Sequence, residues 1–224
     1  MTHPALTKDS VAVVTGGAAG IGLAAATEFA RLGMRLCIVD SRAALLDPAA
    51  DALRGAGAAE VMTSGADVSD LGAVQALEAE VTGRFGGTDI LMNNAGIQPG
   101  SRMLGPSSDW RRILDVNLWG IIQGCQVFAP GMIARGRHGA IINTGSKQGI
   151  TTPPGDPAYN VSKAGVKAFT EALAHELRNT DGARITAHLL IPGFVFTDLT
   201  RRGRTEKPAG AWTAGQTARF MIEH

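Results

Sequence analysis

The sequence has few cysteines, no excess of charge of either sign and no internal repeat. Its 224 residues include two cysteines, 21 lysines and arginines, and 20 aspartates and glutamates. Such balanced charge gives the chain no electrostatic reason to bind nucleic acid or an acidic membrane surface. Cys37 and Cys125 lie in apolar surroundings and form no CxxC pair. They therefore predict buried free thiols in a reducing, cytoplasmic setting and exclude a disulfide framework.

A long uninterrupted apolar run is also missing. Residues 116–134 carry no charge, and they approach the roughly 18 residues that a membrane-spanning helix needs. The segment nevertheless contains Asn117, two glutamines, Pro130 and three glycines, which favour a buried helix. Three histidines could in principle bind a metal, but His138, His175 and His188 lack the spacing of metal ligands. No metal site is therefore predicted.

What the sequence does contain is an alternation of apolar strands and helical patterns. Strands are predicted at 11–15, 35–40, 60–64, 90–93, 140–144 and 185–191. The first predicted helix follows the glycine-rich turn after 11–15 and ends near residue 32. Further helices are predicted at about 41–55, 71–85, 107–135, 158–179 and 212–224, with a kink or break at Pro130. Apolar strands separated by helices indicate a parallel sheet covered on both faces. The predicted fold class is a doubly wound, Rossmann-like α/β domain over residues 1–224.

The first strand leads into a glycine-rich turn, in a chain whose 29 glycines exceed the average share of about 7%. Gly16, Gly20, Ile21 and Gly22 follow the strand and open the next helix. Glycines permit the sharp turn, and the free N–H groups and dipole of the helix favour an anion such as pyrophosphate. Asp40 lies 18 residues beyond Gly22, close to the ~20 expected of a carboxylate that binds ribose hydroxyls. This context predicts a dinucleotide site.

A second motif, Tyr159-Asn-Val-Ser-Lys163, places a phenol and an ammonium four residues apart. On a helix such residues share one face, so both side chains can point into one cleft. A nearby cation favours the phenolate and lowers the pKa of tyrosine from its usual ~10, which suits proton exchange with a substrate hydroxyl. Tyr159 is the only tyrosine in the chain. Ser146 ends the fifth predicted strand, where its hydroxyl can hold the substrate oxygen.

Together these residues resemble the short-chain dehydrogenase/reductase family in its compact, single-domain form. The turn has the T-G-x-x-x-G-I-G spacing of that family, and further motifs follow in the family's order. They are Asp67-Val68, Asn93-Asn94-Ala95-Gly96, Asp115-Val116-Asn117, Ser146, Tyr159 with Lys163, and Pro192-Gly193-Phe194-Val195-Phe196-Thr197. The resemblance covers nearly the whole chain.

The resemblance implies roles for these residues. Tyr159 would be the general acid/base, Ser146 would orient the substrate oxygen, and Lys163 would bind the nicotinamide ribose. Asn117 would support the proton relay, and hydride would pass between the nicotinamide and a secondary alcohol or ketone. The implied cofactor contacts are Gly16, Gly20, Ile21, Gly22, Asp40, Asp67, Val68, Asn94, Ala95, Gly96, Tyr159, Lys163, Pro192, Gly193, Val195 and Thr197.

The cofactor is predicted to be NAD rather than NADP. Asp40 would accept hydrogen bonds from a ribose diol and repel a 2′-phosphate. Ala19 and Ser41 stand where NADP-preferring members of the family often carry a basic residue, whereas Arg42, one position further on, leaves NADP open. Substrate contacts are predicted at Ser146, Gln98, Lys147, Gln148 and Phe194. Residues 200–208 lie where the family keeps a mobile substrate lid, and a solvated loop is the alternative interpretation of their basic, polar sequence.

The leading hypothesis is an NAD-dependent alcohol dehydrogenase or carbonyl reductase acting on a small molecule, and two alternatives stand beside it. An NADPH-dependent 3-oxoacyl reductase would differ in nucleotide preference. A nucleotide-binding sensor without turnover typically lacks the tyrosine or lysine that this chain retains.

The oligomeric state is also predicted. The Gly120-x-x-x-Gly124 spacing permits close helix contact. The resemblance implies that this helix and the Tyr159 helix pair across a two-fold axis, so a homodimer or homotetramer is expected. The family's final parallel strand is expected to be absent from residues 1–224, which weakens the case for a tetramer built on that edge.

Overall fold

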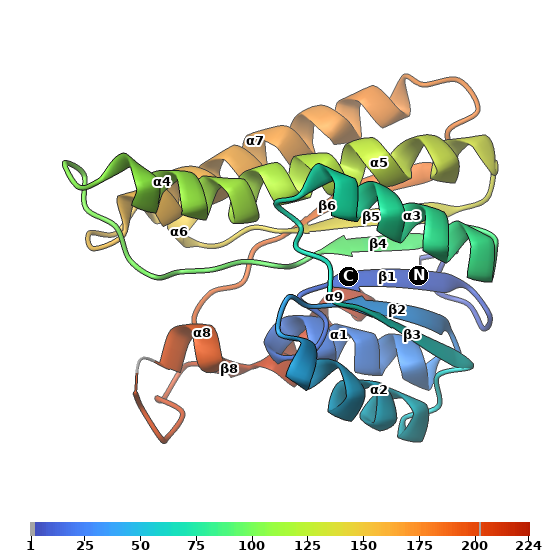
Figure 1. Ribbon diagram of the computed structural model, residues 1–224, viewed down its shortest axis with the longest axis horizontal. Coiled ribbons are helices and arrows are strands. Elements are labelled where there is room, and N and C mark those ends of the chain that lie inside the picture. Colours follow the sequence, from blue (N-terminus) through green and yellow to red (C-terminus); the bar gives the residue numbers. More distant parts are fainter. Residues whose placement is uncertain (1–2, 202) are drawn as a thin grey trace.

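Six parallel strands form the centre of the computed structural model, which describes residues 3–201 and 203–224. In chain order they are β1 (Val11–Thr15), β2 (Arg35–Val39), β3 (Glu60–Ser64), β4 (Ile90–Asn93), β5 (Gly139–Thr144) and β6 (Ile185–Leu190). Their order across the sheet is β3-β2-β1-β4-β5-β6 (Figure 1). From β1 the chain adds β2 and β3 on one side, and it then returns to add β4, β5 and β6 on the other side of β1. Parallel sheets of this kind place a ligand cleft at this switch point, between β1 and β4. The predicted doubly wound parallel sheet is confirmed.

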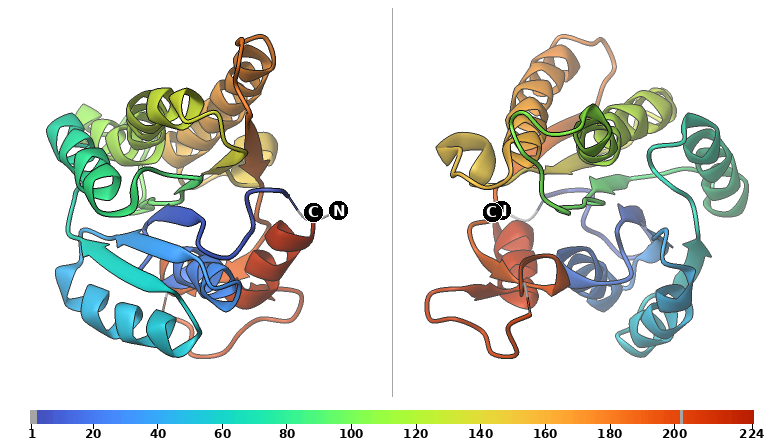
Figure 2. Two further views of the ribbon diagram at one scale, coloured as in Figure 1. Left: turned by 90° about the vertical axis from the view of Figure 1, so that its right-hand side faces the viewer. Right: turned by 60° about the vertical axis from the view of Figure 1, so that its left-hand side comes forward.

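Helices cover both faces of the sheet because every central strand is apolar on both sides (Figure 2). Ala12 and Val14 pack on one face with α1 (Gly20–Arg31), α2 (Leu46–Gly55) and α9 (Ala214–Glu223). Val11 and Val13 pack on the other face with α3 (Leu71–Phe85), α5 (Gly120–Ala134) and α7 (Pro157–Arg178). The shorter helices are η1 (Ala43–Leu45), α4 (Ser107–Leu114), α6 (Gln148–Thr151) and α8 (Asp198–Arg201).

The helix predicted over 107–135 is interrupted, but not at Pro130. It consists of α4, a π-helical turn η2 (Asp115–Trp119) and α5, which continues through Pro130. In the π turn, the side chain of Asn117 bonds the backbone of Ile97. The break therefore coincides with a side-chain contact to another segment, and π turns occur often at such functional positions.

The two glycines of the Gly120-x-x-x-Gly124 spacing face inward. A Cβ atom at Gly120 would lie 2.7 Å from a methyl group of Val68, and one at Gly124 would collide with the side chain of Asn93. These glycines allow α5 to pack closely on its own sheet and on the 68 region. The contacts of these two glycines are therefore made within the chain, and the expected homodimer stays a prediction.

The chain after β6 contains a small second sheet that the sequence pattern did not predict. β7 (Val195–Phe196) pairs with β8 (Trp212–Thr213), and α8 lies between them. α9 begins two residues later than predicted because Thr213 caps it, in a reciprocal pair with Gln216. The predicted lid over 200–208 includes Arg202, which lies outside the described residues. Among the helices of the described chain, none is long and apolar enough to cross a membrane.

Candidate active site

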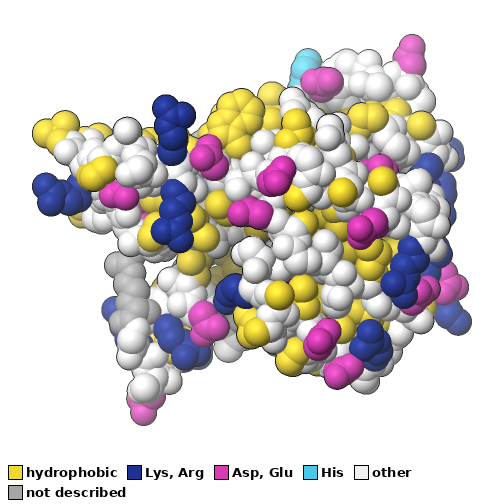
Figure 3. All heavy atoms as spheres, in the orientation of Figure 1, with side chains coloured by type: hydrophobic (Ala, Val, Ile, Leu, Met, Phe, Trp, Pro, Cys, Tyr) yellow, Lys and Arg dark blue, Asp and Glu magenta, His cyan; other side chains and the backbone are white. Residues whose placement is uncertain are grey.

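A large cleft opens at the carboxyl ends of the strands. Its volume is about 1380 Å³, and Figure 3 shows the hollow at the left, between the region of α4 above and that of α8 below. Typical small-molecule pockets measure about 300–1,000 Å³, so this cleft can hold a ligand as large as a dinucleotide together with a small substrate. Nearly all the predicted site residues line it; the exceptions are Gly22 and Asn117, which lie behind its wall.

The β1–α1 turn brings bare backbone to the cleft. Gly16 and Gly20 have φ angles of 61° and 56°, which favour glycine. A Cβ atom at Gly22 would collide with the carbonyl oxygen of Gly16 and lie 2.6 Å from the amide nitrogen of Asn94. The N-cap residue of α1, Ala19, also provides no side-chain cap, whereas Asp70 caps α3. The start of α1 therefore leaves its N–H groups available to an anion, and this cradle fits a pyrophosphate.

Asn94 shapes this cradle from the end of β4. Its side-chain amide donates to the carbonyl oxygens of Thr15 at 3.1 Å and Gly16 at 3.2 Å. The hydroxyl of Thr15 in turn accepts the N–H groups of Asn94 and Ala95. Asn94 was predicted as a cofactor contact; it does line the cleft, and its side chain also ties the end of β4 to the end of β1.

Asp40 lies just beyond β2, buried, with its carboxylate paired to one cation. The guanidinium of Arg42 donates to both oxygens, at 3.0 Å from Nε to Oδ1 and 3.1 Å from Nη2 to Oδ2. The Arg42 side chain itself is half exposed at the mouth of the cleft. The carboxylate predicted to select the cofactor is thus screened by a neighbour, a pairing that the sequence spacing alone did not reveal.

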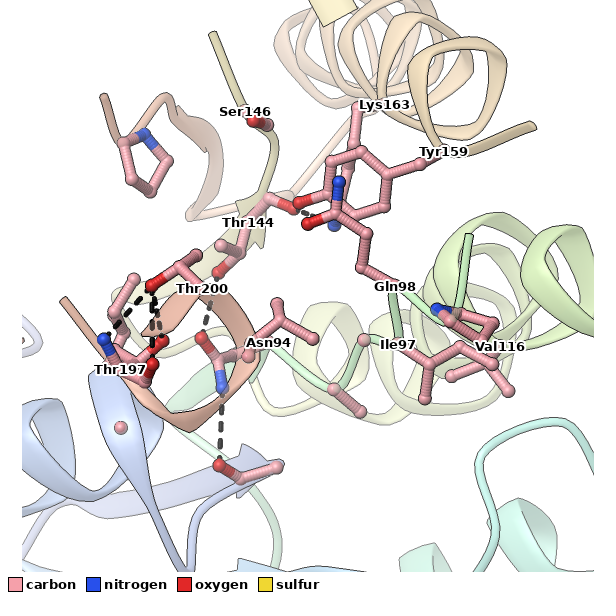
Figure 4. Close-up of a pocket in the computed structure, with 18 of the residues that line it drawn as sticks. Asn94, Ile97, Gln98, Val116, Thr144, Ser146, Tyr159, Lys163, Thr197 and Thr200 are labelled. Atoms are coloured by element: carbon pink, nitrogen blue, oxygen red, sulfur yellow. Dashed lines mark hydrogen bonds between the residues drawn. The ribbon is translucent and has the colours of Figure 1, made fainter. Parts of the chain in front are cut away.

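At the other end of the cleft, α7 presents Tyr159 and Lys163 on one face, as the four-residue spacing predicted (Figure 4). The ammonium of Lys163 lies 5.8 Å from the centre of the Tyr159 ring and donates to the carbonyl oxygen of Thr144 at 2.7 Å. Burial lowers the pKa of Lys163 to about 8. Thr144 was not predicted as a site residue, because a backbone acceptor leaves no mark in the side-chain pattern.

The pKa of Tyr159 is raised in this structure, mainly because burial disfavours the charged phenolate. An interaction with the Ser146 hydroxyl acts in the opposite direction, and the charge of Asp156 raises the pKa further. The expected lowering of the tyrosine pKa by Lys163 is therefore not found: desolvation of the phenol and the charge of Asp156 together outweigh the hydrogen bond with Ser146.

Asn117 is fully buried in the π turn. Its Oδ1 accepts the N–H of Ile97 at 2.8 Å, and its Nδ2 donates to the carbonyl oxygen of Ile97 at 2.9 Å. A Cβ atom at Gly96 would lie 3.4 Å from Asn117 Oδ1 and 3.8 Å from Lys163 Nζ, so these three residues meet at one point. Asn117 thus fixes the segment that follows β4 beside the lysine.

The predicted substrate residues surround the opening beside Tyr159. Gln98 donates from Nε2 to Oε1 of Gln148 at 3.4 Å, and Figure 4 shows Gln98 extending toward Tyr159 from the segment after β4. Lys147 is exposed, and Phe194 is half exposed across the cleft. Sequence reasoning missed the part of the wall contributed by α4 and η2, although its helical spacing was visible: Ser108, Arg111, Arg112, Asp115 and Val116.

No group of three or more histidine, cysteine or acidic side chains able to hold a metal is found among the described residues. Both thiols are buried, and burial raises the pKa of each to about 12.

Comparison with known proteins decides the family. The model of the short chain dehydrogenase family matches residues 10–208. The chain belongs to this family. As a short-chain dehydrogenase/reductase it is an oxidoreductase that acts on CH–OH groups or the corresponding ketones with a nicotinamide dinucleotide. The resemblance drawn from the sequence motifs is confirmed.

Three relatives show the range of this similarity. Galactitol 2-dehydrogenase (L-tagatose-forming) of Cereibacter sphaeroides is 38% identical over 200 residues, which cover 88% of this chain and 75% of the relative. A short-chain dehydrogenase/reductase from Burkholderia phymatum, in complex with NAD, has a TM-score of 0.88 at 34% identity and covers 96% of this chain and 85% of its own. L-Sorbose reductase from Gluconobacter frateurii, complexed with NADPH and L-sorbose, has a TM-score of 0.86 at 28% identity. The match covers 96% of this chain and 89% of the reductase.

Proposed function

We propose that this short-chain dehydrogenase/reductase interconverts a small secondary alcohol and its ketone, with Tyr159 as the proton carrier. One observation carries the proposal: the only tyrosine of the chain lies in the same cleft as Ser146 and Lys163, at the end opposite the glycine cradle. A phenol in that place can exchange a proton with an oxygen held by the Ser146 hydroxyl.

The proton and the hydride leave the alcohol in different directions. In oxidation, the substrate hydroxyl would give its proton to the phenolate oxygen of Tyr159, and Ser146 would hold the substrate oxygen while this proton moves. The cofactor, when bound, supplies this hydride chemistry, and the protein positions the reactants. Lys163 would hold the nicotinamide ribose and, when protonated, favour the phenolate. Asn117 would support the proton relay beside Lys163.

Replacement of Tyr159 by phenylalanine tests the proposal. The Tyr159→Phe variant keeps the ring and loses only the hydroxyl, so we expect turnover to fall at least ~100-fold, the lower end of general acid/base effects. The binding of NADH, followed by its fluorescence, should stay within about two-fold. The assay is formation of reduced nicotinamide with a panel of secondary alcohols, polyols and hydroxy acids. Undiminished turnover in the variant would remove Tyr159 from the mechanism.

A preference for NAD over NADP is the finer part of the proposal. Asp40 supports it, together with the absence of a basic side chain at Ala19 and Ser41. Arg42 opposes it, because its guanidinium neutralises the carboxylate that would repel a 2′-phosphate. We expect a modest preference, and Asp40→Ala should reduce the ratio of NADPH to NADH dissociation constants by about ten-fold. An unchanged ratio would contradict the role of Asp40.

The 3-oxoacyl reductase alternative predicts the opposite preference, tighter binding of NADPH than of NADH, so the same titration decides between the two. A homodimer remains a proposal as well, since Trp119 on η2 and Val161 on α7 expose apolar side chains beyond the intrachain packing. Light scattering of the purified chain measures its mass in solution, and the mass of a single chain would contradict the homodimer.

A further inference from the structure

The start of α7 holds a buried carboxylate that capping does not require. Asp156, the N-cap residue, is only 4% exposed. Its Oδ1 accepts the N–H of Tyr159 at 3.4 Å and the hydroxyl of Ser101 at 2.5 Å. Within the described chain, its Oδ2 is buried without a hydrogen-bond partner. Asp70, the N-cap of α3, differs because it is exposed to solvent.

A buried carboxylate with an unpaired oxygen costs free energy, because its charge loses water without full compensation. Asparagine or serine caps a helix about as well as aspartate does. The capping function therefore does not explain the charge at Asp156. What distinguishes this cap from that of α3 is its place: Asp156 lies three residues before Tyr159, in the first turn of the same helix.

Ser101 links this cap to the segment that carries Gln98. Its hydroxyl accepts the N–H of Ala158 at 3.0 Å and donates to Asp156. The segment after β4 is thus fixed at two points, by Asn117 at Ile97 and by Asp156 at Ser101. Gln98 lies between the two, so both anchors determine where it stands relative to the phenol.

Charged and polar groups reach the surroundings of Tyr159 from several elements, and Arg111, Arg112 and Asp115 of α4 and η2 line the same cleft. From α7 itself, Lys163 lies under the ring, and its ammonium is engaged by the carbonyl oxygen of Thr144. From the end of β5 comes the neutral hydroxyl of Ser146, while Lys147 next to it is exposed. α4 contributes the apolar side chains of Ile113 and Trp110. Among these groups, Asp156 is the one whose charge acts to raise the pKa of Tyr159.

We propose that Asp156 is a positioning residue for Tyr159: with Ser101 it fixes the first turn of α7, and it places a buried negative charge at the backbone of the proton carrier. The proposal rests on the proposed role of Tyr159 as proton carrier. The charge of Asp156 disfavours the phenolate, as burial does, so removal of this charge should lower the pH at which the proton is exchanged.

The single tyrosine allows a direct test that needs neither substrate nor turnover. In protein labelled with ¹³C at the tyrosine ring carbon that bears the hydroxyl, Tyr159 gives one NMR signal, whose shift reports its ionisation. The Asp156→Asn variant keeps the capping oxygen and removes the charge. We expect the ionised fraction of Tyr159 at pH 10.5 to rise several-fold, up to the about ten-fold limit that a shift of one pKa unit sets. The matched control, Asp70→Asn, should leave it unchanged.

A second variant protects the test against misfolding. Asp156→Ser also caps the helix without a charge, and circular dichroism at the same pH reports whether each variant is folded. If folded Asp156→Asn and Asp156→Ser both leave the ionised fraction within two-fold of wild type, the proposal is overturned. Tyr159→Phe decides the role of Tyr159 separately, so the two failures are distinguishable.

The kinetic consequence has a definite sign. Oxidation needs the phenolate and reduction needs the phenol, so a lower pKa moves the pH profiles of both directions to lower pH. Ser101→Ala breaks the link and keeps the charge, so we expect a several-fold higher KM without a pH shift. Ser10→Ala, which alters a buried serine bonded to Thr7 far from the cleft, is its control. A loss of activity in Asp156→Asn with no pH shift would show a merely structural role and overturn the proposal.

Discussion

The two ends of the cleft are built in different ways. At the cofactor end, contacts are made by backbone: a Cβ atom at Gly16 would lie 3.0 Å from the backbone of Ala95, and one at Gly17 would lie 2.7 Å from a carbonyl oxygen. At the substrate end, side chains such as Lys147 and Phe194 stand partly in solvent. Close backbone packing admits one ligand shape, whereas exposed side chains can be exchanged without disturbing the fold. This difference explains why the motifs reveal the family and leave the substrate open.

The largest effect is expected where the backbone is tightest. Gly22→Ala places a methyl group against the carbonyl oxygen of Gly16, and neither segment can move without opening the turn. We expect a loss of about 1–3 kcal/mol in the free energy of unfolding and at least a ten-fold weaker binding of NADH. Gly83→Ala in α3 is the control, because its added methyl group meets no atom within 4 Å. Denaturant titration measures the free energy of unfolding, and NADH fluorescence measures binding. Wild-type values of both in Gly22→Ala would contradict the view that close backbone packing builds the cofactor end.

A moderate effect is expected at Lys163, where the two ends meet. Because its pKa in the folded protein is lowered to about 8, folding disfavours the charged form. The cost is fully present below pH 8 and disappears as the pH rises toward the unfolded value. Lys163→Met should therefore be more stable than wild type by about 1–3 kcal/mol at pH 7, with the gap closing by about pH 10.5.

The matched control for this stability measurement lies one helical turn further along α7. Lys167 is partly exposed and paired with Glu171, so Lys167→Met should change the free energy of unfolding by less than about 1 kcal/mol. Equal stability of Lys163→Met and wild type across this pH range would show that burial of the ammonium carries no cost.

The smallest effect is expected at the substrate end. Phe194→Ala removes a half-exposed ring from the cleft, so NADH binding should stay within about two-fold. The KM for the alcohol found in the panel should rise by about 3–10-fold, as for loss of one apolar pocket contact. Phe220→Ala on α9, equally exposed and outside the cleft lining, should change neither value. A loss of NADH binding in Phe194→Ala would mean that the two ends are not separable.

The same division accounts for what the sequence could reveal. The strands, the glycine turn and the Tyr159–Lys163 pair depend on local spacing, and the structure places them as predicted. The pairing of Arg42 with Asp40 depends on a side-chain rotamer, and that of Asp156 with Ser101 joins residues 55 positions apart. The inward direction of Gly120 depends on how α5 lies against Val68. Contacts of this kind leave no periodic pattern for sequence reasoning to detect.

The uncapped start of α1 has a practical consequence for handling the protein. N–H groups that lack a side-chain acceptor can be satisfied by small anions from the buffer. Inorganic phosphate or pyrophosphate would then compete with the dinucleotide and stabilise the folded chain increasingly as its concentration exceeds its dissociation constant. Affinities measured in phosphate would be weaker than those measured in a zwitterionic buffer, and melting temperatures would be higher. The difference between the dinucleotide affinities in the two buffers thus reports how strongly the start of α1 binds an anion.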